Sequence, residues 1–543
     1  MTSLLLGLVL AAGPSDSTGA ARRATDELFR AIPAEVGAVA VLEDLDGFIT
    51  RIEQAEIVKR LRRSSVLGGA VEREVVRYWK ELDSKFQSRI GVGLETLRKD
   101  VFGLSVVLAY WPKAGGPKDE TGLLLVRARS AERLDELLHT LFRIQGGEPP
   151  KRTHAGVPYW TSRDGERQQF LLTLGPIGML TDDEEAVQRV IQTAKGGKSW
   201  ESEAAFGVMR SVTPKGALLS VFLLPRKFDV KLPMQSSGKP GEAMVQEAIA
   251  GVWKSLEWVS FTAQVESSLQ FGLHASVDAS KLPPQLGQRP ALGESPIPTQ
   301  GLKGTIASFA AGADVAALSQ FIGRLIAESN PKDAAAGGRF VRSLFMGADR
   351  ASELVKSVGP RLGAAVIDMP DGLPASVVAL ELRPAASPGG LASNADLVEQ
   401  ALRFAALALT LEANKNGDDR WELRTESMNG ARVHIAAGGK NLPKGVEPCF
   451  SIHKGWILAA SNPSALRQAL TEPHPEVTTG EFGRLDLQAA QKVVARFANL
   501  TASANPQGAA FLDAVADAVP LLLLKENVAG GAHHWTLELP APK

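Results

Sequence analysis

The sequence predicts an α+β protein built from two similar tandem domains, each an antiparallel or mixed sheet with helices packed on one face. Two observations support this prediction. Hairpins alternate with amphipathic helices along the chain, and the order of these elements restarts after a proline-rich segment. Strict strand–helix alternation, the pattern of parallel sheets, is not seen. At 543 residues the chain is also too long for one ordinary hydrophobic core.

The clearest unit runs from Phe170 to Lys195 and reads as strand, turn, strand and helix. Gly175-Pro176 splits two short apolar runs, which is typical of a hairpin. Thr181 and Glu184 have the spacing of a capping box, and Gly196-Gly197 supplies a left-handed stop. One helical face carries the predicted core residues Ala186, Val187, Val190, Ile191 and Ala194.

A weaker copy of this unit runs from Cys449 to Pro473. Asn462 precedes Pro463, a residue that fits the first turn of a helix. The copy repeats the same apolar stripe with Ala465, Leu466, Ala469 and Leu470.

Five elements recur in one order on both sides of the proline-rich segment, which predicts tandem duplication. We place a first repeat at 24–278, a linker at 279–301 and a second repeat at 302–543. The linker holds five prolines without periodicity and is expected to be semi-extended. The paired stretches are 37–42 with 304–309, 104–111 with 362–369, 123–142 with 377–409, 170–195 with 449–473, and the hairpin 259–277 with 521–539.

Composition indicates a globular protein without a dominant charge. Hydrophobic residues make up 44%, and 60 Lys and Arg balance 60 Asp and Glu. Nothing therefore steers the whole chain toward nucleic acid or an anionic membrane, although a local patch is compatible with these numbers. Cys449 is the only cysteine, which excludes an intramolecular disulfide and a four-cysteine zinc site. In its apolar context Cys449 is expected to be a buried small hydrophobe.

The N-terminus has the character of an export signal. Leu4 to Ala12 is an apolar run of signal-peptide length, too short to span a bilayer. We assign residues 1–23 to a signal peptide and leader, which predicts a periplasmic or secreted protein with no transmembrane segment and no lipid anchor in the mature chain. Thr18-Gly-Ala20 is a candidate cleavage site. A buried N-terminal helix is the alternative interpretation.

Several packing motifs resemble those of a family of exported bacterial proteins catalogued only as a domain of unknown function. They are Ile32-Pro-Ala-Glu, Asp44-Leu-Asp46, Val92-Gly-Leu-Glu with Phe102-Gly103, and Glu120-Thr-Gly-Leu-Leu-Leu-Val, together with the strand and helix at Met179 to Ile191. The resemblance lies mainly in residues 30–280. It implies export, and it supplies no catalytic residue.

Three short motifs imitate known ligand sites. Gly196-Gly-Lys-Ser199 resembles the end of a phosphate loop but follows a helix, so a helix C-cap is expected. Asn414-Lys-Asn416-Gly417-Asp418 imitates a calcium loop but lacks its final glutamate, which favours a turn. Asp44-Leu-Asp46-Gly47 fits a helix cap, with a cation site as the alternative.

The eight histidines are scattered. His533 and His534 are adjacent in a predicted strand, so their side chains should point to opposite faces and cannot share one ion. His434, His453 and His474 could converge in space, but they lack a metal-site spacing. The tyrosines occur as Tyr78-Trp79, Tyr110-Trp111 and Tyr159-Trp160. Packing is the expected role of these pairs, and a shared aromatic surface for a glycan or peptide is the alternative.

No catalytic, cofactor-binding or metal-binding residue can be assigned from the sequence, which leans against an enzyme. The first hypothesis is an exported, non-catalytic protein that binds or scaffolds a partner, such as an envelope protein or a ligand, in the cell envelope. The alternatives are a hydrolase-type enzyme whose site is assembled from residues distant in sequence, and a periplasmic receptor that binds a ligand between the two halves.

The predicted helix face can be tested by two substitutions in the 170–195 unit. Val190→Asp should lower the free energy of unfolding by several kcal/mol, because it buries a charge in the core. Glu185→Lys lies on the exposed side and should change little beyond a small helix-dipole effect. Thermal melting of both variants is the measurement, and equal losses would show that the helix face is misassigned.

Overall fold

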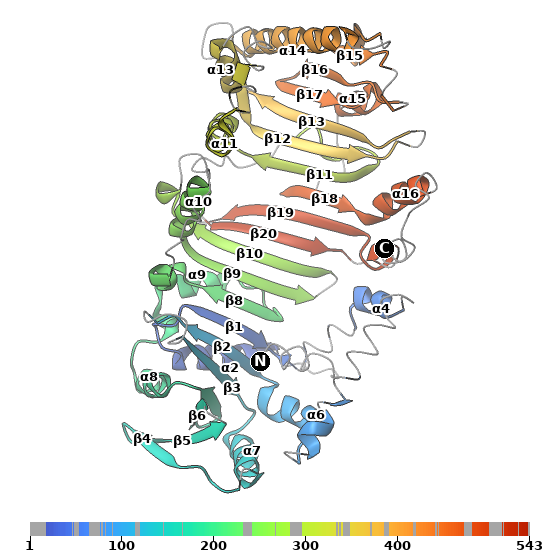
Figure 1. Cartoon of the computed structure of the whole chain (residues 1–543). Helices are drawn as coiled ribbons and strands as arrows, with labels where there is room; N and C mark the ends of the chain where they lie inside the picture. Colours follow the sequence, from blue (N-terminus) through green and yellow to red (C-terminus); the bar gives the residue numbers. More distant parts are fainter. Residues whose placement is uncertain are drawn as a thin grey trace.

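The computed structural model contains one twisted antiparallel sheet that runs through the whole molecule (Figure 1). All twenty strands that the structure describes belong to this sheet. Every pairing between them is antiparallel, so the α+β class predicted from the sequence is confirmed. The structure describes residues 18–540 with interruptions, of which the longest are 64–76, 114–119, 232–241, 283–295, 340–347, 385–389, 472–479 and 499–512, with shorter ones mainly inside 46–90 and 333–339.

The ten strands of the first half lie side by side in an order set by their hydrogen-bonded pairs. Across the sheet they are β4 (Lys151–His154), β5 (Val157–Asp164), β6 (Arg167–Leu174), β7 (Ile177–Thr181), β3 (Thr121–Arg127), β2 (Ser105–Trp111), β1 (Ala38–Glu43), β8 (Leu219–Leu223), β9 (Leu256–Val265) and β10 (Leu269–Val277).

The second half continues the sheet beyond β10. Its strands follow in the order β20 (Ala532–Leu539), β19 (Leu521–Ala529), β18 (Glu481–Asp486), β11 (Thr305–Gly312), β12 (Val358–Ile367), β13 (Ala375–Leu382), β17 (Trp456–Ala460), β16 (Cys449–His453), β15 (Ala431–Ala437) and β14 (Glu422–Met428).

The two halves repeat one strand order in opposite directions from the centre. Each strand of the first half occupies the same position as the strand of the second half whose number is higher by ten. The pairs run from β4 and β14 at the two edges to β10 and β20 at the junction. Because β10 and β20 pair antiparallel, a pseudo-two-fold axis perpendicular to the sheet relates the halves. Such an axis turns the same face of both halves to the same side. The halves therefore share a topology, but they form one sheet. Whether each is an independent domain stays a prediction.

The two faces of the sheet have different coverings. On the side that we call the back face, α2 (Thr18–Ala31), α8 (Glu184–Ala194), α9 (Ala204–Val212) and α15 (Pro463–Ala469) pack on the strands. The first three cover a core that includes Val107 and Leu125, whereas α15 covers Val377 and Leu458. Each half thus has its own back-face core, apart from Ala532, which joins the first from β20.

The opposite side, which we call the inner face, also carries helices, mostly around its border (Figure 1). Val106 and Val126 alternate with the back-face core residues and pack on α7, and Leu380 and Ile457 lie in the cluster of α14. The prediction placed helices on one face only, so this is a difference. The inner-side elements are α4 (Glu56–Arg63), α6 (Leu94–Leu97), the π-helix η1 (Arg98–Phe102), α7 (Ala131–Ile144), the 3₁₀ helix η3 (Pro225–Lys231), α10 (Glu242–Ser255), α11 (Val315–Ser329), α13 (Ala348–Ser357), α14 (Gly390–Lys415) and α16 (Leu487–Ala498).

In the 170–195 unit the predicted hairpin and helix are present, but the cap differs. Asp183 caps α8 by accepting from the backbone of Glu185, because Thr181 still belongs to β7 and donates to the carbonyl of Gly122. Val190 is fully buried, as predicted, and the exposed Glu185 pairs with Lys113. Ala194 is exposed, and Thr193 takes its place on the buried side.

The copy agrees more closely with the prediction. Asn462 caps α15 through the backbone of Ala465, with Pro463 at the start of the helix. All four stripe residues are buried. Cys449 is buried too, and burial raises the pKa of its thiol to about 12. An unreactive packing role follows.

Two predicted boundaries need correction. The linker ends earlier than expected, because Ile297 and Thr299 are buried against β12, where a side chain at Gly363 would collide with both. Residues 283–295 of the linker lie outside the described chain. The assigned leader also overlaps the fold, because α2 begins at Thr18 and its Ala21 is buried. The apolar run of the leader lies outside the described residues.

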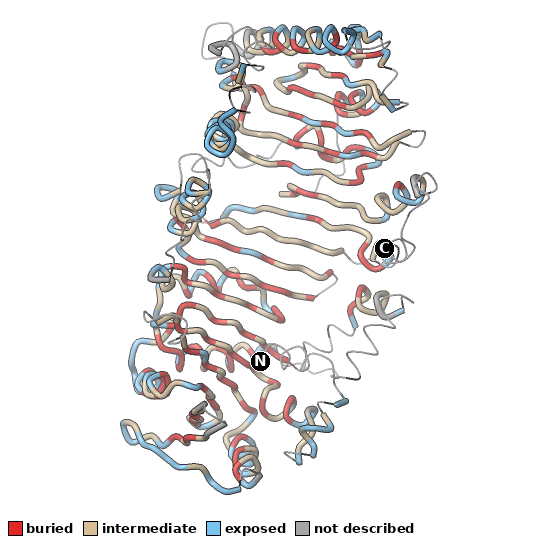
Figure 2. The backbone as a smooth tube through the Cα atoms, viewed as in Figure 1, coloured by how far each residue is buried: buried red, intermediate tan, exposed pale blue. Residues whose placement is uncertain are grey.

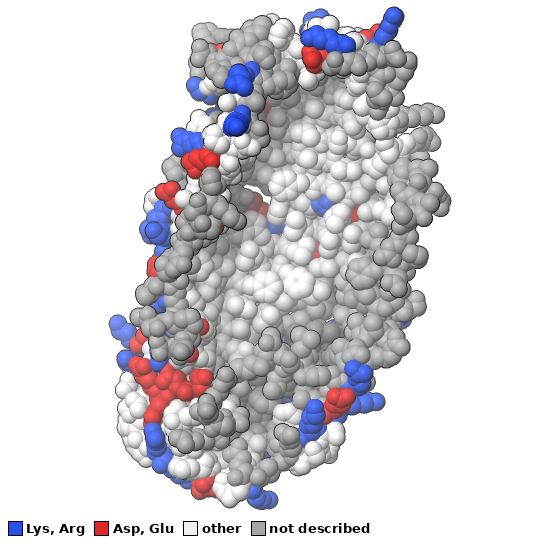
Figure 3. Space-filling view, in the orientation of Figure 1, with Lys and Arg blue, Asp and Glu red and all other residues white. Residues whose placement is uncertain are grey.

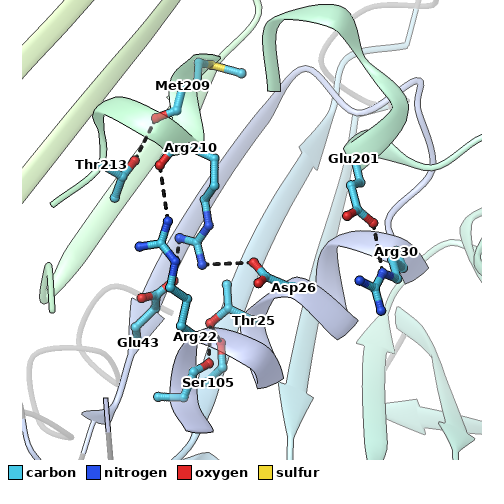
Figure 4. A network of polar contacts seen from close by, with 11 residues as sticks. Arg22, Thr25, Asp26, Arg30, Glu43, Ser105, Glu201, Met209, Arg210 and Thr213 are labelled. Atoms are coloured by element: carbon cyan, nitrogen blue, oxygen red, sulfur yellow. Dashed lines mark hydrogen bonds and ion pairs between the residues drawn. The ribbon is translucent and has the colours of Figure 1, made fainter. Parts of the chain in front are cut away.

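Polar contacts fix α2 against the back of the sheet (Figure 4). The hydroxyls of Thr25 and Ser105 lie 2.7 Å apart, and Arg22 donates to the carbonyl of Arg210. The guanidinium of Arg210 pairs with Asp26 at 3.0 Å and with Glu43 at 2.5 Å, and it lies with Glu43 among buried residues. Removal of one partner would leave a buried charge uncompensated. This network makes α2 part of the folded body.

The junction predicts how the first half behaves alone. A fragment of residues 18–278 exposes the edge of β10, and the pseudo-two-fold axis makes a second β10 a suitable substitute for β20. We expect this fragment to be dimeric by light scattering, with the full chain at the same concentration as reference. A folded, monodisperse monomer would contradict the role given to the β10–β20 ladder.

Candidate binding face

Side chains on the inner face form rows that cross the sheet from strand to strand. The register places one residue of each strand beside its neighbour, so a row can be followed through both halves. We call the longest of these the central row. It consists of Ala459, Val378, Ala364, Phe309, Gly483, Leu524, Leu537, Phe271, Ala263, Leu219, Leu42, Val106 and Val126.

Between Ala459 and Val126 the central row contains no polar side chain; beyond Ala459 the same register continues through Phe450 to His434, which is polar. A second inner-face row runs beside the central row, displaced by two residues along each strand. It is also apolar except at one end, where Glu526 lies. Its members are Glu526, Trp535, Leu273, Phe261, Val221, Ala40, Leu108, Leu124 and Leu180. The backbone groups between these rows are engaged in ladders on both sides. The floor of the inner face therefore offers mainly hydrocarbon to a contacting molecule.

The middle of this floor is open to solvent. Phe309 is 46% exposed and Leu273 is 43% exposed, although both lie on interior strands. Figure 2 shows half-buried and exposed stretches along these strands instead of continuous burial. Isolated exposed apolar residues are ordinary, but a contiguous patch is a recognised mark of a binding surface. The large exposed side chains of the floor are Leu273, Phe309, Val366, Val378, Leu524 and Val528.

The floor lies in a hollow. In the space-filling view, the described residues in the upper middle form a hollow, which we call the recess, in which few Lys, Arg, Asp or Glu are seen (Figure 3). Lys, Arg, Asp and Glu gather mainly on the outer parts of the view. Among the coloured residues, formal charge is thus sparse in the recess, and the strand register gives its floor mainly apolar side chains.

The sides of the recess are built by packing on the flanking rows. Trp253 of α10 packs edge-on against Phe228 of η3, which in turn stacks on Tyr110 at 5.7 Å. Across the floor, Leu487 of α16 and Ile57 of α4 join a cluster that includes residues of both halves. These contacts cover the flanking rows and leave the middle bare.

One polar cluster lies on the floor near the junction of the halves. The carboxylate of Glu526 accepts from the indole nitrogen of Trp535 at 3.0 Å and contacts Nδ1 of His533 at 3.2 Å. The rings of His533 and Trp535 are stacked. The polar groups of Glu526, Trp535 and His533 contact one another. The cluster therefore does not resemble a catalytic site whose groups are directed at a substrate.

Helix α11 is unusual for an apolar helix, because none of its residues is buried. Its sequence, VAALSQFIGRLIAES, holds only two charged residues. Leu318, Ile322 and Ile326 recur every four residues and are exposed, and they therefore form one stripe along the helix. The neighbouring helix α10 exposes Val245 and Ile249 at the same spacing. Both helices lie along one border of the sheet (Figure 1).

The predicted opposition of His533 and His534 is confirmed, because His534 lies on the back face. There its Nδ1 meets Nδ1 of His274 at 2.8 Å across the β10–β20 ladder. One nitrogen must donate and the other accept, so the pair is held together only while at least one ring is neutral. Burial, with a smaller contribution from the charge of His534, lowers the pKa of His274 to about 4.

The described residues of the other sequence motifs take part in caps and turns. Gly196 has a φ of 101° and ends α8, as the C-cap prediction requires. Asp44 accepts from the backbone of Gly47 and pairs with Arg51, whereas Asp46 lies outside the described residues. Asn414 bonds to both backbone groups of Trp421, and the turn after it, 416–419, is not described.

The three candidate histidines do not converge where they can be followed. His434 contacts Glu399 at 2.9 Å on the side of α14, and His453 ends β16 beside Trp456. His474 lies outside the described residues. In the part of the chain that the structure describes, no group of three or more His, Cys, Asp and Glu could hold a metal ion.

The aromatic pairs split across the sheet wherever they are described. Tyr110 faces inward and Trp111 is in the back-face core, while Tyr159 is buried and bonded to Glu184. Trp160 packs on Phe142 of α7. They serve packing and make no shared surface. Tyr78 and Trp79 are not described.

Sequence reasoning did not identify the floor as a site. Its residues read as ordinary strand positions, since apolar residues on both faces of a strand predict burial on both. The signal that could have found it is the excess of apolar strands over amphipathic helices able to cover them.

Comparison with known proteins adds no relative: no family model, no curated protein and no solved structure matches this chain. Among the helices that can be placed, none is long and apolar enough to cross a membrane.

The histidine pair predicts an acid-sensitive junction. Because the pKa of His274 is lowered from about 6.5 to about 4 on folding, its stabilising contribution is present above pH 6.5 and is lost as the pH falls toward 4. Thermal unfolding followed from pH 7 to pH 4 should show a loss of about 1 to 3 kcal/mol that is smaller in His274→Asn. His139→Asn, at an exposed position of α7, is the matched control. Identical pH profiles for wild type and His274→Asn would exclude this role.

Proposed function

We propose that this chain is an exported, non-catalytic binding protein of the cell envelope, and that its partner contacts the floor of the inner face. The observation that carries the proposal is the central row, a charge-free apolar strip that crosses both halves and is exposed along its stretch through Val378, Phe309 and Leu524. Exposure of apolar surface to water is unfavourable in free energy, and a partner that covers this surface removes it from water.

The chemistry of the floor favours binding over catalysis. Among the floor residues that the structure describes, the carboxylate of Glu526 is engaged by Trp535 and His533, and no acid, base and nucleophile come together there. The floor also crosses the junction between the halves. This is where the alternative hypothesis of a ligand receptor expects its ligand, and that hypothesis becomes one form of the present proposal.

Export is supported by the apolar run from Leu4 to Ala12 and by the motifs that resemble a family of exported proteins. The burial of Ala21 in α2 limits how the leader could be removed, because cleavage after Ala20 would delete the first turn of a core helix. We therefore place the cleavage before Thr18.

A neutral apolar fluorophore tests the binding function. N-phenyl-1-naphthylamine should bind the wild-type chain, and Phe309→Glu should weaken this binding by about tenfold or more, since a charge in the middle of the floor must be desolvated. Phe309→Leu keeps the surface apolar and should bind normally. Melting temperatures verify folding. Absence of binding to wild type, or equal binding to all three proteins, would refute the proposal.

A further inference from the structure

Two features indicate what kind of partner the chain binds: the surface of α11 and the floor of the inner face. We infer that the occupant of the floor is the acyl part of a membrane lipid, and that the chain collects it while α10 and α11 rest on a bilayer. This inference rests on the proposed function, because it names the partner that the floor would bind.

The first step concerns hydrogen bonding. A peptide lying on the floor would bring backbone N–H and C=O groups that need partners, whereas the central row offers none and the adjoining strands have already paired their own. Among the strands that the structure describes, only β4 and β14 at the sheet edges have an unpaired side for strand addition. A hydrocarbon chain has no such need and loses nothing by lying there.

The second step concerns length. From Val378 on β13 to Phe271 on β10 the central row crosses six strand spacings, which amounts to about 29 Å. One leaflet of a bilayer has a hydrocarbon depth of about 15 Å. The exposed strip therefore has room for acyl chains along its full length and is not limited to a small apolar molecule.

The third step distinguishes a lipid from an amphipathic helix. A helix bound to the floor would cover the central row and leave the stripe of Leu318, Ile322 and Ile326 bare. A bilayer surface accounts for both features, because it can receive the apolar stripes of α11 and α10 and supply acyl chains to the recess beside them. The helices need not span the membrane for this contact.

The charge of the chain indicates what kind of bilayer surface it would contact. Basic and acidic residues are equal in number, and α11 carries one of each, Arg324 and Glu328. Electrostatic attraction to anionic lipid is therefore not the source of binding. We expect the chain to act on zwitterionic vesicles and to gain little from added phosphatidylglycerol.

The test is transfer of pyrene-labelled phosphatidylcholine between phosphatidylcholine vesicles by the full chain. Wild type should accelerate transfer, and Ile322→Glu on α11 should reduce both vesicle co-sedimentation and transfer by about tenfold or more, or about 1.4 kcal/mol. Phe309→Glu should reduce transfer but leave co-sedimentation intact. Gln320→Glu, at an exposed polar position of α11 outside the apolar stripe, and Phe309→Leu are the matched controls and should behave as wild type.

Trp535 supplies a local readout, because it lies on the floor beside Leu273. Vesicles with bromine-labelled acyl chains should quench wild type more than Trp535→Phe. If the fluorophore binds but neither transfer nor quenching occurs, the floor binds another apolar partner, and the lipid inference fails while the proposed function stands. If the fluorophore also fails to bind, both the lipid inference and the proposed function are refuted. Transfer that Phe309→Glu leaves unchanged would also overturn the inference.

Discussion

The pairing of β10 with β20 is the interaction on which the rest of this structure depends. It joins equivalent strands of two halves that share one strand order, and its antiparallel direction turns the same face of each half to the same side. Had the halves met through another pair of strands, each would keep its back-face core, but the apolar rows would end at the boundary. The ladder is what makes the central row continuous.

The two faces of the sheet differ because helices cover them differently. On the back, α8 and α15 lie directly over the strands and close two cores around residues such as Val190 and Leu466. On the inner side the helices pack toward the ends and borders, so the flanking rows are covered and the middle is not. A sheet of this width has more apolar surface than its border helices can bury. The open floor follows from that geometry.

Local patterns in the sequence predicted the α+β class, the unit at 170–195 and the cap of Asn462 on α15, since turns, caps and helix stripes depend on neighbouring residues. They failed where the outcome depends on distant partners. Thr181 was predicted to cap α8, but its pairing within β7 leaves that role to Asp183. Ile297 was placed in a linker, although it is buried against β12, where a side chain at Gly363 would collide with it. The predicted tandem repeat is compatible with the shared strand order, but no local pattern could show that the two halves would share one sheet.

The candidate site was hidden for a related reason. Phe309 and Phe222 both look like core residues in the sequence, yet Phe309 is 46% exposed and Phe222 is fully buried. The difference lies in what packs on each from far along the chain: Phe222 meets Phe29 and Trp200, whereas Phe309 meets only the edge of Phe482 among the aromatic side chains that the structure describes. An apolar surface of this size would ordinarily promote association. Its position in a twisted, recessed floor prevents two flat sheets from stacking, but it admits a flexible chain. This shape is compatible with the flexible apolar partner that we propose.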